Sequence, residues 1–281
     1  MVGLSARREM ATHLEQEYQV SQRRSCKVLG LARSTHRRQT GRRDVDLIKR
    51  LIELSHKYPR FGYRKVWKLL VKEGFTISRE RTRLLRRQEG LQVRKKAKKQ
   101  RRSGSSTGLP TQATHGNHVW SYDFVADQTI DGRRLRCLTV IDEFTRQCLV
   151  IEISRSLTAA DVKRVLTVLF EIYGQPSYIR SDNGAEFTAR SITDWLKQET
   201  KVKTLFIDPG SPWQNGFNES FNGIFRDSCL NCWGFESIRE AREITDNWIY
   251  EYNYIRPHGS LNLMTPIEFI ASHQNEVKQA A

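Results

Sequence analysis

The 281-residue sequence lacks any run of about 18 or more apolar residues, so it contains no candidate membrane-spanning helix. Its first ten residues also lack the apolar segment of a secretion signal, because Arg7, Arg8 and Glu9 interrupt them. These absences argue against a membrane-bound or an exported protein. We expect a cytoplasmic protein without a membrane partner.

Cysteine is scarce, and its five occurrences have neither the even number nor the spacing of a disulfide framework. We expect all five thiols to be reduced. Cys229 and Cys232 form a C-x-x-C pair, but no second cysteine or histidine pair follows at the spacing of a zinc finger. We therefore expect no zinc module around this pair.

A sustained heptad repeat is also absent, and no repeat of solenoid type is visible. The apolar helical runs of the first hundred residues are too short for a stable coiled coil. We therefore expect the free chain to be monomeric or only weakly associated.

Acidic residues are few in the first part of the chain. Residues 1–110 contain 30 Lys and Arg against 9 Asp and Glu, a net charge of +21, whereas residues 111–281 contain 17 against 22, a net charge of −5. Such asymmetry favours a polyanionic partner bound by the first part, because neutralised phosphates release condensed counterions. A solvated basic surface without a partner is the alternative.

Two modules of helix-turn-helix type are predicted, over residues 1–40 and 41–93. In the first, Gly30 marks a turn and Ser34 can cap the next helix. In the second, apolar side chains at helical spacing predict two helices, followed by Gly74 and a third helix over residues 79–89 that Ser78 can cap. The apolar positions of the first two helices are Val45, Ile48 and Ile52, then Tyr63, Val66, Trp67 and Leu70.

The helix over residues 79–89 is a candidate recognition helix, with Leu84 and Leu85 expected to face inward. Its outward arginines are expected at Arg79, Arg83, Arg86 and Arg87. An ordinary solvated helix face is the alternative. Residues 94–114 follow as a basic, flexible linker, because RKKAKKQRR is followed by SGSSTGLP. We assign DNA contacts there to Arg94, Lys95 and Lys96.

Residues 115–281 change to an α/β pattern. Three β-rich runs begin at Trp120, Arg134 and Arg146, and Asp131-Gly132 is a hairpin signal between the first two. An amphipathic helix from Thr158 to Gly174 and a strand–helix–strand segment over 177–208 follow. The pattern predicts a mixed sheet covered by helices. The apolar face of the amphipathic helix is expected to comprise Val162, Val165, Leu166, Leu169 and Ile172.

Three carboxylates stand out. Asp123 interrupts the strand W-S-Y-D-F-V, on the face opposite Trp120, Tyr122 and Phe124, although aspartate is disfavoured in strands. Asp182 follows the apolar pair Tyr178-Ile179 and precedes Asn183-Gly184, which places it at the end of a strand. Either aspartate alone is more typical of a turn.

Glu219 lies in a predicted helix whose apolar stripe is Phe217, Phe221, Ile224 and Phe225. On another face Asn215, Glu219, Asn222 and Arg226 recur at intervals of four, three and four. Arg226 is about 10 Å from Glu219 at a rise of 1.5 Å per residue, so it could hold a phosphate beside the reacting one. We expect second-sphere or turn roles for Asp142, Glu143 and Glu186.

The segments WSYDF, SDNGAEF, SPWQNGFNESFNG and YNYIRPHGSLN resemble the OrfB transposases of the insertion-sequence-three family, within the integrase-like enzymes with an RNase H-like fold. The resemblance implies an integrase-type mixed sheet with flanking helices, and places Asp123, Asp182 and Glu219 at the acidic triad. Arg226 matches the basic residue two turns beyond the glutamate. The interval between Asp182 and Glu219 is one residue longer than is usual, and we place that residue near Lys201.

The chemistry of the triad implies a cation. Carboxylates within about 4 Å repel each other by roughly 4 kcal/mol per pair at an effective dielectric constant near 20. Oxygen ligands favour Mg²⁺ or Mn²⁺, and two such ions would activate a water or a DNA 3′-hydroxyl and stabilise the leaving oxygen. The expected activity is DNA strand cleavage and strand transfer at the ends of a bacterial insertion sequence.

Two alternatives remain open at this point: a non-enzymatic DNA-binding regulator and a simple nuclease of RNase H type. The resemblance implies double-stranded DNA partners, both terminal repeats and target. It also implies a possible upstream OrfA partner or frameshift fusion, a homo-oligomer formed on DNA, and a nucleoid-associated location.

Overall fold

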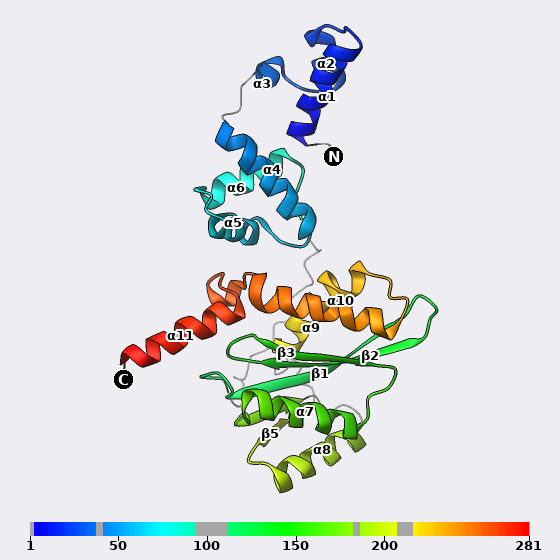
Figure 1. The fold of residues 1–281 in the computed structure, drawn as a ribbon, viewed down its shortest axis with the longest axis vertical. Coiled ribbons are helices and arrows are strands. Elements are labelled where there is room, and N and C mark those ends of the chain that lie inside the picture. The colour runs from blue at the N-terminus through cyan, green and yellow to red at the C-terminus, as the bar shows by residue number, and fades with distance from the viewer. Residues whose placement is uncertain (1–2, 38–41, 94–111, 182–185, 207–215, 281) are drawn as a thin grey trace, which may run out of the picture. The chain divides into compact units, whose positions relative to one another are not determined.

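The computed structural model describes residues 3–37, 42–93, 112–181, 186–206 and 216–280. These residues form two compact units, one within residues 1–100 and the other within 101–281 (Figure 1). Residues 94–111 of the expected linker lie outside the described ranges. No described helix has the length and hydropathy needed to cross a lipid bilayer.

Three short helices begin the first unit: α1 (Leu4–Glu17), α2 (Gln22–Val28) and α3 (Arg33–Arg37). Gly30 has a positive φ of 58° in the turn between α2 and α3, as the sequence predicts. Ser34 lies inside α3, so the prediction that it caps this helix was wrong. The buried apolar core of these helices is small and consists of Ala11, Cys26 and Leu31.

The next three helices are α4 (Arg42–Lys57), α5 (Tyr63–Lys72) and α6 (Arg79–Gln88). The buried stripe of α4 is Leu47, Leu51 and Leu54, whereas Val45 is 50% exposed. The prediction of a stripe at Val45, Ile48 and Ile52 was wrong, because both rows are apolar at helical spacing and periodicity cannot choose between them. In α5, two of the predicted apolar positions, Val66 and Leu70, are buried as expected.

Helix α6 begins where the sequence predicts, and the Ser78 side chain accepts a hydrogen bond from the Arg81 amide at 3.1 Å. Leu85 is buried, but Leu84 is 38% exposed, so only one of the two leucines faces inward. Arg86 is also misassigned: it is 3% exposed and donates to the carbonyls of Phe61 and Leu91. Backbone oxygens accept from both terminal guanidinium nitrogens of Arg86, which offsets part of the cost of burying its charge, although its Nε has no hydrogen-bond partner among the described residues.

The second unit is built on a five-stranded sheet with the order β3-β2-β1-β4-β5. Antiparallel pairing joins β1 to β2 and β2 to β3, and parallel pairing joins β1 to β4 and β4 to β5. This mixed sheet, with the β1–β2 hairpin turning at Gly132, has the RNase H-like arrangement that the sequence predicts. The strands are β1 (Val119–Gln128), β2 (Arg134–Asp142), β3 (Cys148–Ser154), β4 (Tyr178–Ser181) and β5 (Lys203–Phe206).

Helices cover both faces of the sheet (Figure 1). Helices α7 (Ala159–Tyr173) and α8 (Glu186–Glu199) pack on one face with Trp120 and Tyr122. Helices α9 (Gly216–Ser228) and α10 (Ile238–Tyr250) pack on the other face, where Val125 lies. Because strand side chains alternate, Asp123 belongs to the α9 face.

Helix α7 begins after Thr158 as predicted, and a capping box closes its start, in which the side chains of Thr158 and Asp161 accept hydrogen bonds from each other's backbone amides. Val162, Val165, Leu166 and Leu169 are buried, but Ile172 is 65% exposed, so the predicted apolar face ends one turn early. The helix stops at Gly174, which has a positive φ of 80°.

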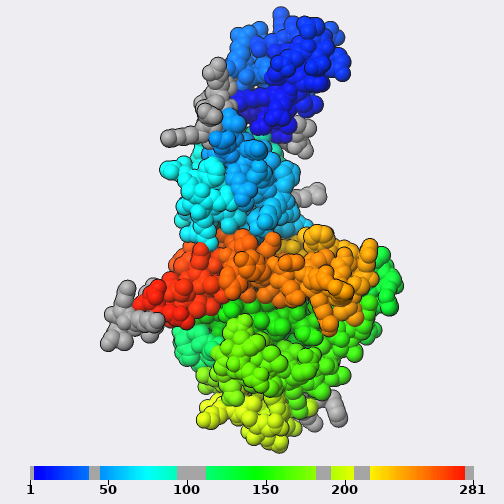
Figure 2. All heavy atoms as spheres, viewed as in Figure 1, coloured from blue at the N-terminus to red at the C-terminus, as the bar shows by residue number. Residues whose placement is uncertain are grey.

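The C-terminal elements continue the α10 layer. A 3-10 turn (Leu230–Cys232) follows α9, a π-helical turn (Glu251–Ile255) follows α10, and α11 (Pro266–Ala280) ends the chain. Figure 2 shows α10 and α11, orange to red, as a continuous layer along one side of the second unit. Asn253 fixes this layer to the sheet, because its amide accepts from the Cys148 amide at 2.9 Å and donates to the Cys148 carbonyl at 2.8 Å.

Candidate active site

Asp123 lies in the middle of β1, the strand that pairs with both β2 and β4. Trp120 and Tyr122 point into the α7–α8 core, so Asp123 faces the opposite side of the sheet, as predicted. The Asp123 carboxylate is partly exposed, and its Oδ1 accepts a hydrogen bond from the Phe124 amide at 2.7 Å. Asp123 is therefore within reach of solvent.

A side chain from α9 holds the other oxygen of Asp123. Asn222 Nδ2 donates to Asp123 Oδ2 at 2.7 Å, and Asn222 Oδ1 accepts from the Thr139 hydroxyl at 3.2 Å. Thr139 is the cross-strand partner of Asp123 and also lies 3.2 Å from its carbonyl oxygen. The hydroxyl sets the orientation of the Asn222 amide, and the amide sets the rotamer of the carboxylate.

Two further bonds seat α9 on the same strand. Asn218 Nδ2 donates to the Tyr122 carbonyl at 3.1 Å, and Arg226 donates to the Ala126 carbonyl at 3.1 Å. Together with Asn222 these residues recur every four positions, so one face of α9 follows β1. Phe221 and Phe225 bury the neighbouring face in the core, as the predicted apolar stripe requires.

Glu219 is exposed in the first turn of α9. It precedes Asn222 by three residues, which places the two side chains one turn apart on the same side of the helix. The helix that holds Asp123 in place is therefore the helix that carries Glu219. Arg226 lies two turns beyond Glu219 and is exposed, although its guanidinium also bonds the Ala126 carbonyl.

Asp182 lies outside the described residues, as do Asn215, Arg94, Lys95 and Lys96. The side chain of Glu186 is likewise outside the described part. Strand β4 ends at Ser181, and its Arg180 is in register with Ser121 of β1.

A buried ion pair joins Arg180 of β4 to Glu143, at the level of Ser121 in β1. Arg180 Nε is 2.9 Å from Glu143 Oε1, and the side chains are 1% and 0% exposed. The Ser121 hydroxyl donates to the same Glu143 oxygen. Burial raises the pKa of Glu143, and the bonds from Ser121 and Arg180 oppose that rise. The pair ties the loop after β2 to β1 and β4, which is a supporting role of the kind expected for Glu143.

Asp142 has a turn role. Its Oδ1 accepts from the amides of Phe144 and Thr145, and its Oδ2 accepts from the Asn117 amide at 2.7 Å. The next turn residue, Arg146, has a positive φ of 62° and stacks its guanidinium 3.9 Å from the centre of the Phe217 ring. This contact connects the β2–β3 turn to the start of α9.

Thr139, Arg180 and Arg146 were missed by reasoning from the sequence. Arg180 carried a readable signal, because a charged residue inside the short strand Y-I-R-S must be buried with a partner or lie at an edge. Thr139 and Arg146 carried none, because their partners are about 80 and 70 residues away along the chain.

The donor set fits a hard divalent cation. The Asp123 oxygens accept from the Phe124 amide and the Asn222 amide, and each oxygen of a carboxylate has lone pairs for more than one partner. Glu219 offers an exposed carboxylate on the adjoining helix. Carboxylate oxygens without a thiol or imidazole are the ligands that Mg²⁺ and Mn²⁺ prefer.

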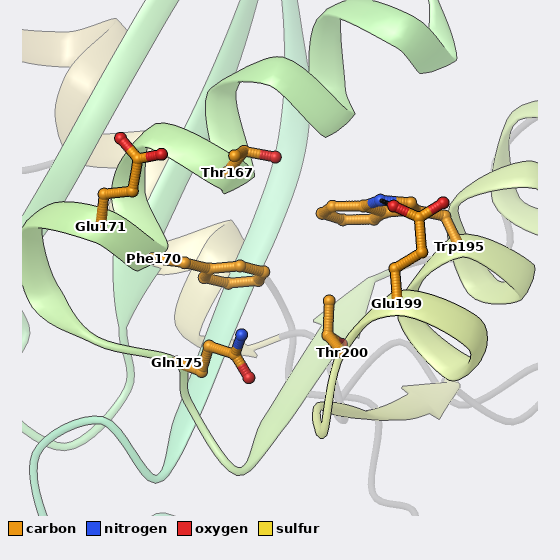
Figure 3. A pocket seen from close by; sticks show the side chains of 7 residues that line it. All are labelled: Thr167, Phe170, Glu171, Gln175, Trp195, Glu199 and Thr200. Carbon is orange, nitrogen blue, oxygen red and sulfur yellow. Dashed lines mark hydrogen bonds between the residues drawn. The ribbon is translucent and has the colours of Figure 1, made fainter.

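A shallow cavity lies on the opposite face of the sheet, between α7 and α8 (Figure 3). Its volume is about 310 Å³, and the Phe170 and Trp195 rings line it in parallel, with their centres 6.1 Å apart. Because Asp123 faces α9, the sheet separates this cavity from the carboxylate, and the cavity has no place in the site.

The candidate DNA-contact arginines of α6 differ in their surroundings. Arg79 lies over the Trp67 ring at 4.5 Å, and Arg83 bonds Glu80 at 2.9 Å, whereas Arg86 is buried. Arg87 is exposed in the last turn of α6. Three of the four predicted arginines thus have accessible surface, and Arg86 serves the internal packing of the unit.

Known domain families match three stretches of the chain. An integrase core domain matches residues 113–212, a second integrase core domain profile matches residues 200–266, and an HTH-like domain matches residues 42–99. The sheet and these matches define the class: an integrase core domain preceded by a helix-turn-helix-like domain.

Relatives narrow the class to a family. The chain is 37% identical over 268 residues to a 31.7 kDa protein of insertion element IS407 from Burkholderia multivorans, covering 93% of this chain and 94% of the relative. It is 27% identical over 236 residues to the candidate transposase InsK of IS150 from Escherichia coli, covering 80% and 83%. The magnesium complex of the HTLV-2 integrase catalytic core has a TM-score of 0.43 at 16% identity, covering 54% of this chain and 95% of that chain. The chain belongs to the OrfB proteins of the insertion-sequence-three family.

Proposed function

We propose that this protein is a transposase that uses a divalent metal to cleave DNA strands at the ends of an insertion sequence and to join them to a target. The observation that carries the proposal is the hydrogen bond from Asn222 of α9 to the Asp123 carboxylate. The same helix carries Glu219, so it both positions the first carboxylate and supplies a second. Membership of the OrfB family and the name of InsK support the same reaction class.

In this proposal Asp123, Asp182 and Glu219 hold the cation, with two Mg²⁺ or Mn²⁺ ions per site. When bound, the ions lower the pKa of an attacking water or DNA 3′-hydroxyl and stabilise the charge on the leaving oxygen. Asn222 and Thr139 keep the Asp123 carboxylate in one rotamer, so the site needs little reorganisation when the cation enters. No serine, cysteine or histidine is required as a nucleophile.

The remaining polar residues of α9 would handle the DNA backbone. Arg226 lies about 10 Å from Glu219 along the helix, a distance suited to a phosphate next to the one attacked. Its exposed guanidinium has donors beyond the one that bonds Ala126, because arginine carries five N–H groups. Asn215 is proposed to bind DNA on the same side.

The first unit would hold the element ends through Arg79, Arg83 and Arg87, with Arg94, Lys95 and Lys96 following the duplex backbone. Terminal repeats and target are both double-stranded DNA. Because two ends must be handled together, we propose a homo-oligomer that forms on DNA, with or without an upstream OrfA partner. The expected site of action is the bacterial nucleoid.

The test is a strand-cleavage and strand-transfer assay with the full chain, labelled duplexes of the element ends and Mg²⁺. Asp123→Asn, Asp182→Asn and Glu219→Gln should each lower the rate by about two orders of magnitude or more, because each removes a metal ligand. DNA binding should stay close to that of the unchanged protein. Glu199→Gln, an acid beside the α7–α8 cavity, is the matched control and should keep full activity.

The assay also separates the transposase from a regulator that only binds DNA. A regulator would bind the element ends in the presence of Mg²⁺ without cutting them. Cleavage that none of the three substitutions lowers would reject the acidic triad itself.

A further inference from the structure

Three metal-binding side chains meet in the N-terminal helices, far from any carboxylate of the proposed active site in the sequence. A carboxylate oxygen of Glu15, the thiol of Cys26 and a ring nitrogen of His36 all lie within 4.8 Å of one another. Each comes from a different helix: Glu15 from α1, Cys26 from α2 and His36 from α3. One ion bound here would link all three helices.

The distance between the ligand atoms of His36 and Glu15 suits a tetrahedral ion. His36 Nε2 is 3.2 Å from Glu15 Oε1. Two ligands bound at about 2.0–2.1 Å to a tetrahedral zinc are separated by about 3.3 Å, so this edge needs almost no adjustment. A zinc-bound sulfur at about 2.3 Å requires roughly 3.5 Å to the other ligands, which a small rotation of the Cys26 side chain can supply.

Burial favours a bound ion over an open polar cluster. The side chains of His36 and Glu15 are 9% and 23% exposed, and Cys26 is 2% exposed. His36 Nδ1 has no hydrogen-bond partner among the described residues, so the polar contact that holds the ring here is the one between its Nε2 and Glu15. The Ser25 hydroxyl donates to Glu15 Oε1 at 2.6 Å, which is the kind of outer bond that orients a metal-binding carboxylate.

The charges of the cluster also balance. A thiolate and a carboxylate together neutralise a divalent ion, and neutral imidazole adds no charge. A soft thiolate beside an imidazole selects zinc over the Mg²⁺ or Mn²⁺ that suits an all-oxygen site. Three protein ligands leave one position of a tetrahedron for a water molecule.

The surrounding helices have little else to stabilise them. Residues 3–37 bury only three apolar side chains fully, namely Ala11, Cys26 and Leu31. Segments shorter than about 40 residues seldom fold on a hydrophobic core alone and commonly use a metal, a disulfide or a partner. The described contact with the rest of the unit includes one bond from the Ser5 amide to Glu89 at 3.0 Å.

We propose that Glu15, Cys26 and His36 bind one zinc ion that joins α1, α2 and α3 and stabilises this helical module. The ion would hold the three helices together through three protein ligands and one water molecule, and the site is independent of the proposed catalytic cations in the second unit. The competing account is a hydrogen-bonded Glu15–His36 pair beside a core cysteine that binds no metal.

Cobalt substitution in the full chain tests the proposal. After chelation, added Co²⁺ should give thiolate-to-cobalt absorption in the near ultraviolet that saturates at one thiolate-bound ion per chain, with tetrahedral bands in the visible, and Zn²⁺ should displace this ion. Cys26→Ser and His36→Gln should weaken this binding by at least about 100-fold, because each removes a ligand. Glu15→Gln should weaken it while keeping a side chain of the same shape.

Three variants serve as matched controls. Cys232→Ser removes the exposed thiol of the C-x-x-C pair, and His13→Gln removes an exposed histidine of α1, and both should keep the thiolate band. Asp123→Asn should also keep it, which separates this site from the proposed catalytic one. Loss of the band in Cys232→Ser, or its retention in Cys26→Ser, would overturn the assignment.

Amide hydrogen exchange in the unchanged chain gives a second test that does not depend on whether a variant folds. In the unchanged chain, zinc should slow amide exchange in α1, α2 and α3 by at least about tenfold and leave α7 unchanged, since binding to the folded state alone stabilises it. Exchange in the three helices that does not respond to zinc, together with no cobalt–thiolate absorption, would establish the metal-free account.

Discussion

Among single residues, Asn222 of α9 joins two strands of the sheet, because its side-chain amide donates to Asp123 of β1 and accepts from Thr139 of β2. We expect Asn222→Ala to lower Mg²⁺-dependent cleavage by about 10–100-fold, as loss of an outer partner of a metal ligand does. The loss should be greatest at limiting Mg²⁺, and it should be measured as the Mg²⁺ concentration that gives half-maximal rate.

The sequence also allows Asn222 to contact DNA, and the same variant decides between the two roles. Weaker DNA binding with an unchanged Mg²⁺ dependence would identify Asn222 as a DNA contact and not as the residue that positions Asp123. Asn247→Ala is the control, since the Asn247 amide bonds only the Glu243 carbonyl on the exposed side of α10.

The Arg180–Glu143 pair should matter for stability. Glu143→Gln would remove the carboxylate that pairs with the buried Arg180 guanidinium, and breaking one side of a buried pair costs about 3–5 kcal/mol. Urea unfolding of the second unit measures this loss. Arg239→Gln removes an exposed partner of Glu243 and should change stability by less than about 0.5 kcal/mol. If the two substitutions lowered the free energy of unfolding equally, the buried pair would not stabilise the second unit more than an exposed pair does.

Among the elements, the α10 layer is bonded to strand β3 by the Asn253 amide and by Arg242, which donates to the Ile153 carbonyl. Asn253→Ala would remove both bonds to Cys148 and leave a buried amide and carbonyl unpaired, at a cost of roughly 2–4 kcal/mol. Thermal unfolding followed by circular dichroism measures it. A loss no larger than that of an exposed asparagine, such as Asn247→Ala, would show that the Asn253 bonds add little to the apolar contacts of this layer and to the Arg242 bond.

Element types and boundaries were largely predictable because each rests on local signals. The Ser78 cap, the Thr158 capping box and the Gly132 turn act within a few residues, so they can be read from the sequence. The buried face of α4 was not predictable, because two rows of its apolar side chains have the same period and only the packing partner selects one. The same holds for Arg86, whose burial depends on carbonyls in two other segments.

The site was predictable in its residue types and only partly in its connections. Asp123 stood out because a charged side chain is disfavoured inside a strand, and Glu219 because it shares one polar face of its helix with Asn222 and Arg226 in a segment that resembles the family. The bond from Asn222 to Asp123 spans 99 residues, and no local pattern specifies such a contact. From the sequence we predicted that Asn222 lies on the Glu219 face of α9 and contacts DNA. Its bond to Asp123 could be found only once the fold was known.

For the whole molecule, the charge division predicts that residues 1–110, with a net charge of +21, dominate DNA binding. Replacing Arg79, Arg83 and Arg87 with Gln should weaken binding. It should also reduce the slope of log K against log salt by about 2.7, because each lost phosphate contact contributes about 0.9. Arg239→Gln, on the second unit, should leave the slope unchanged. A slope that is insensitive to all three changes would place the DNA contacts elsewhere.

The central claim is that Asp123 contacts a catalytic metal, and a change of metal preference tests it most directly. Asp123→Cys replaces a hard oxygen ligand with a soft sulfur, which favours Mn²⁺ over Mg²⁺. In single-turnover cleavage of an element-end duplex, we expect the ratio of the Mn²⁺ rate to the Mg²⁺ rate to rise at least about tenfold above that of the unchanged protein. A variant that cleaves with Mg²⁺ at the original rate, or whose rate ratio is unchanged, would contradict metal binding by Asp123.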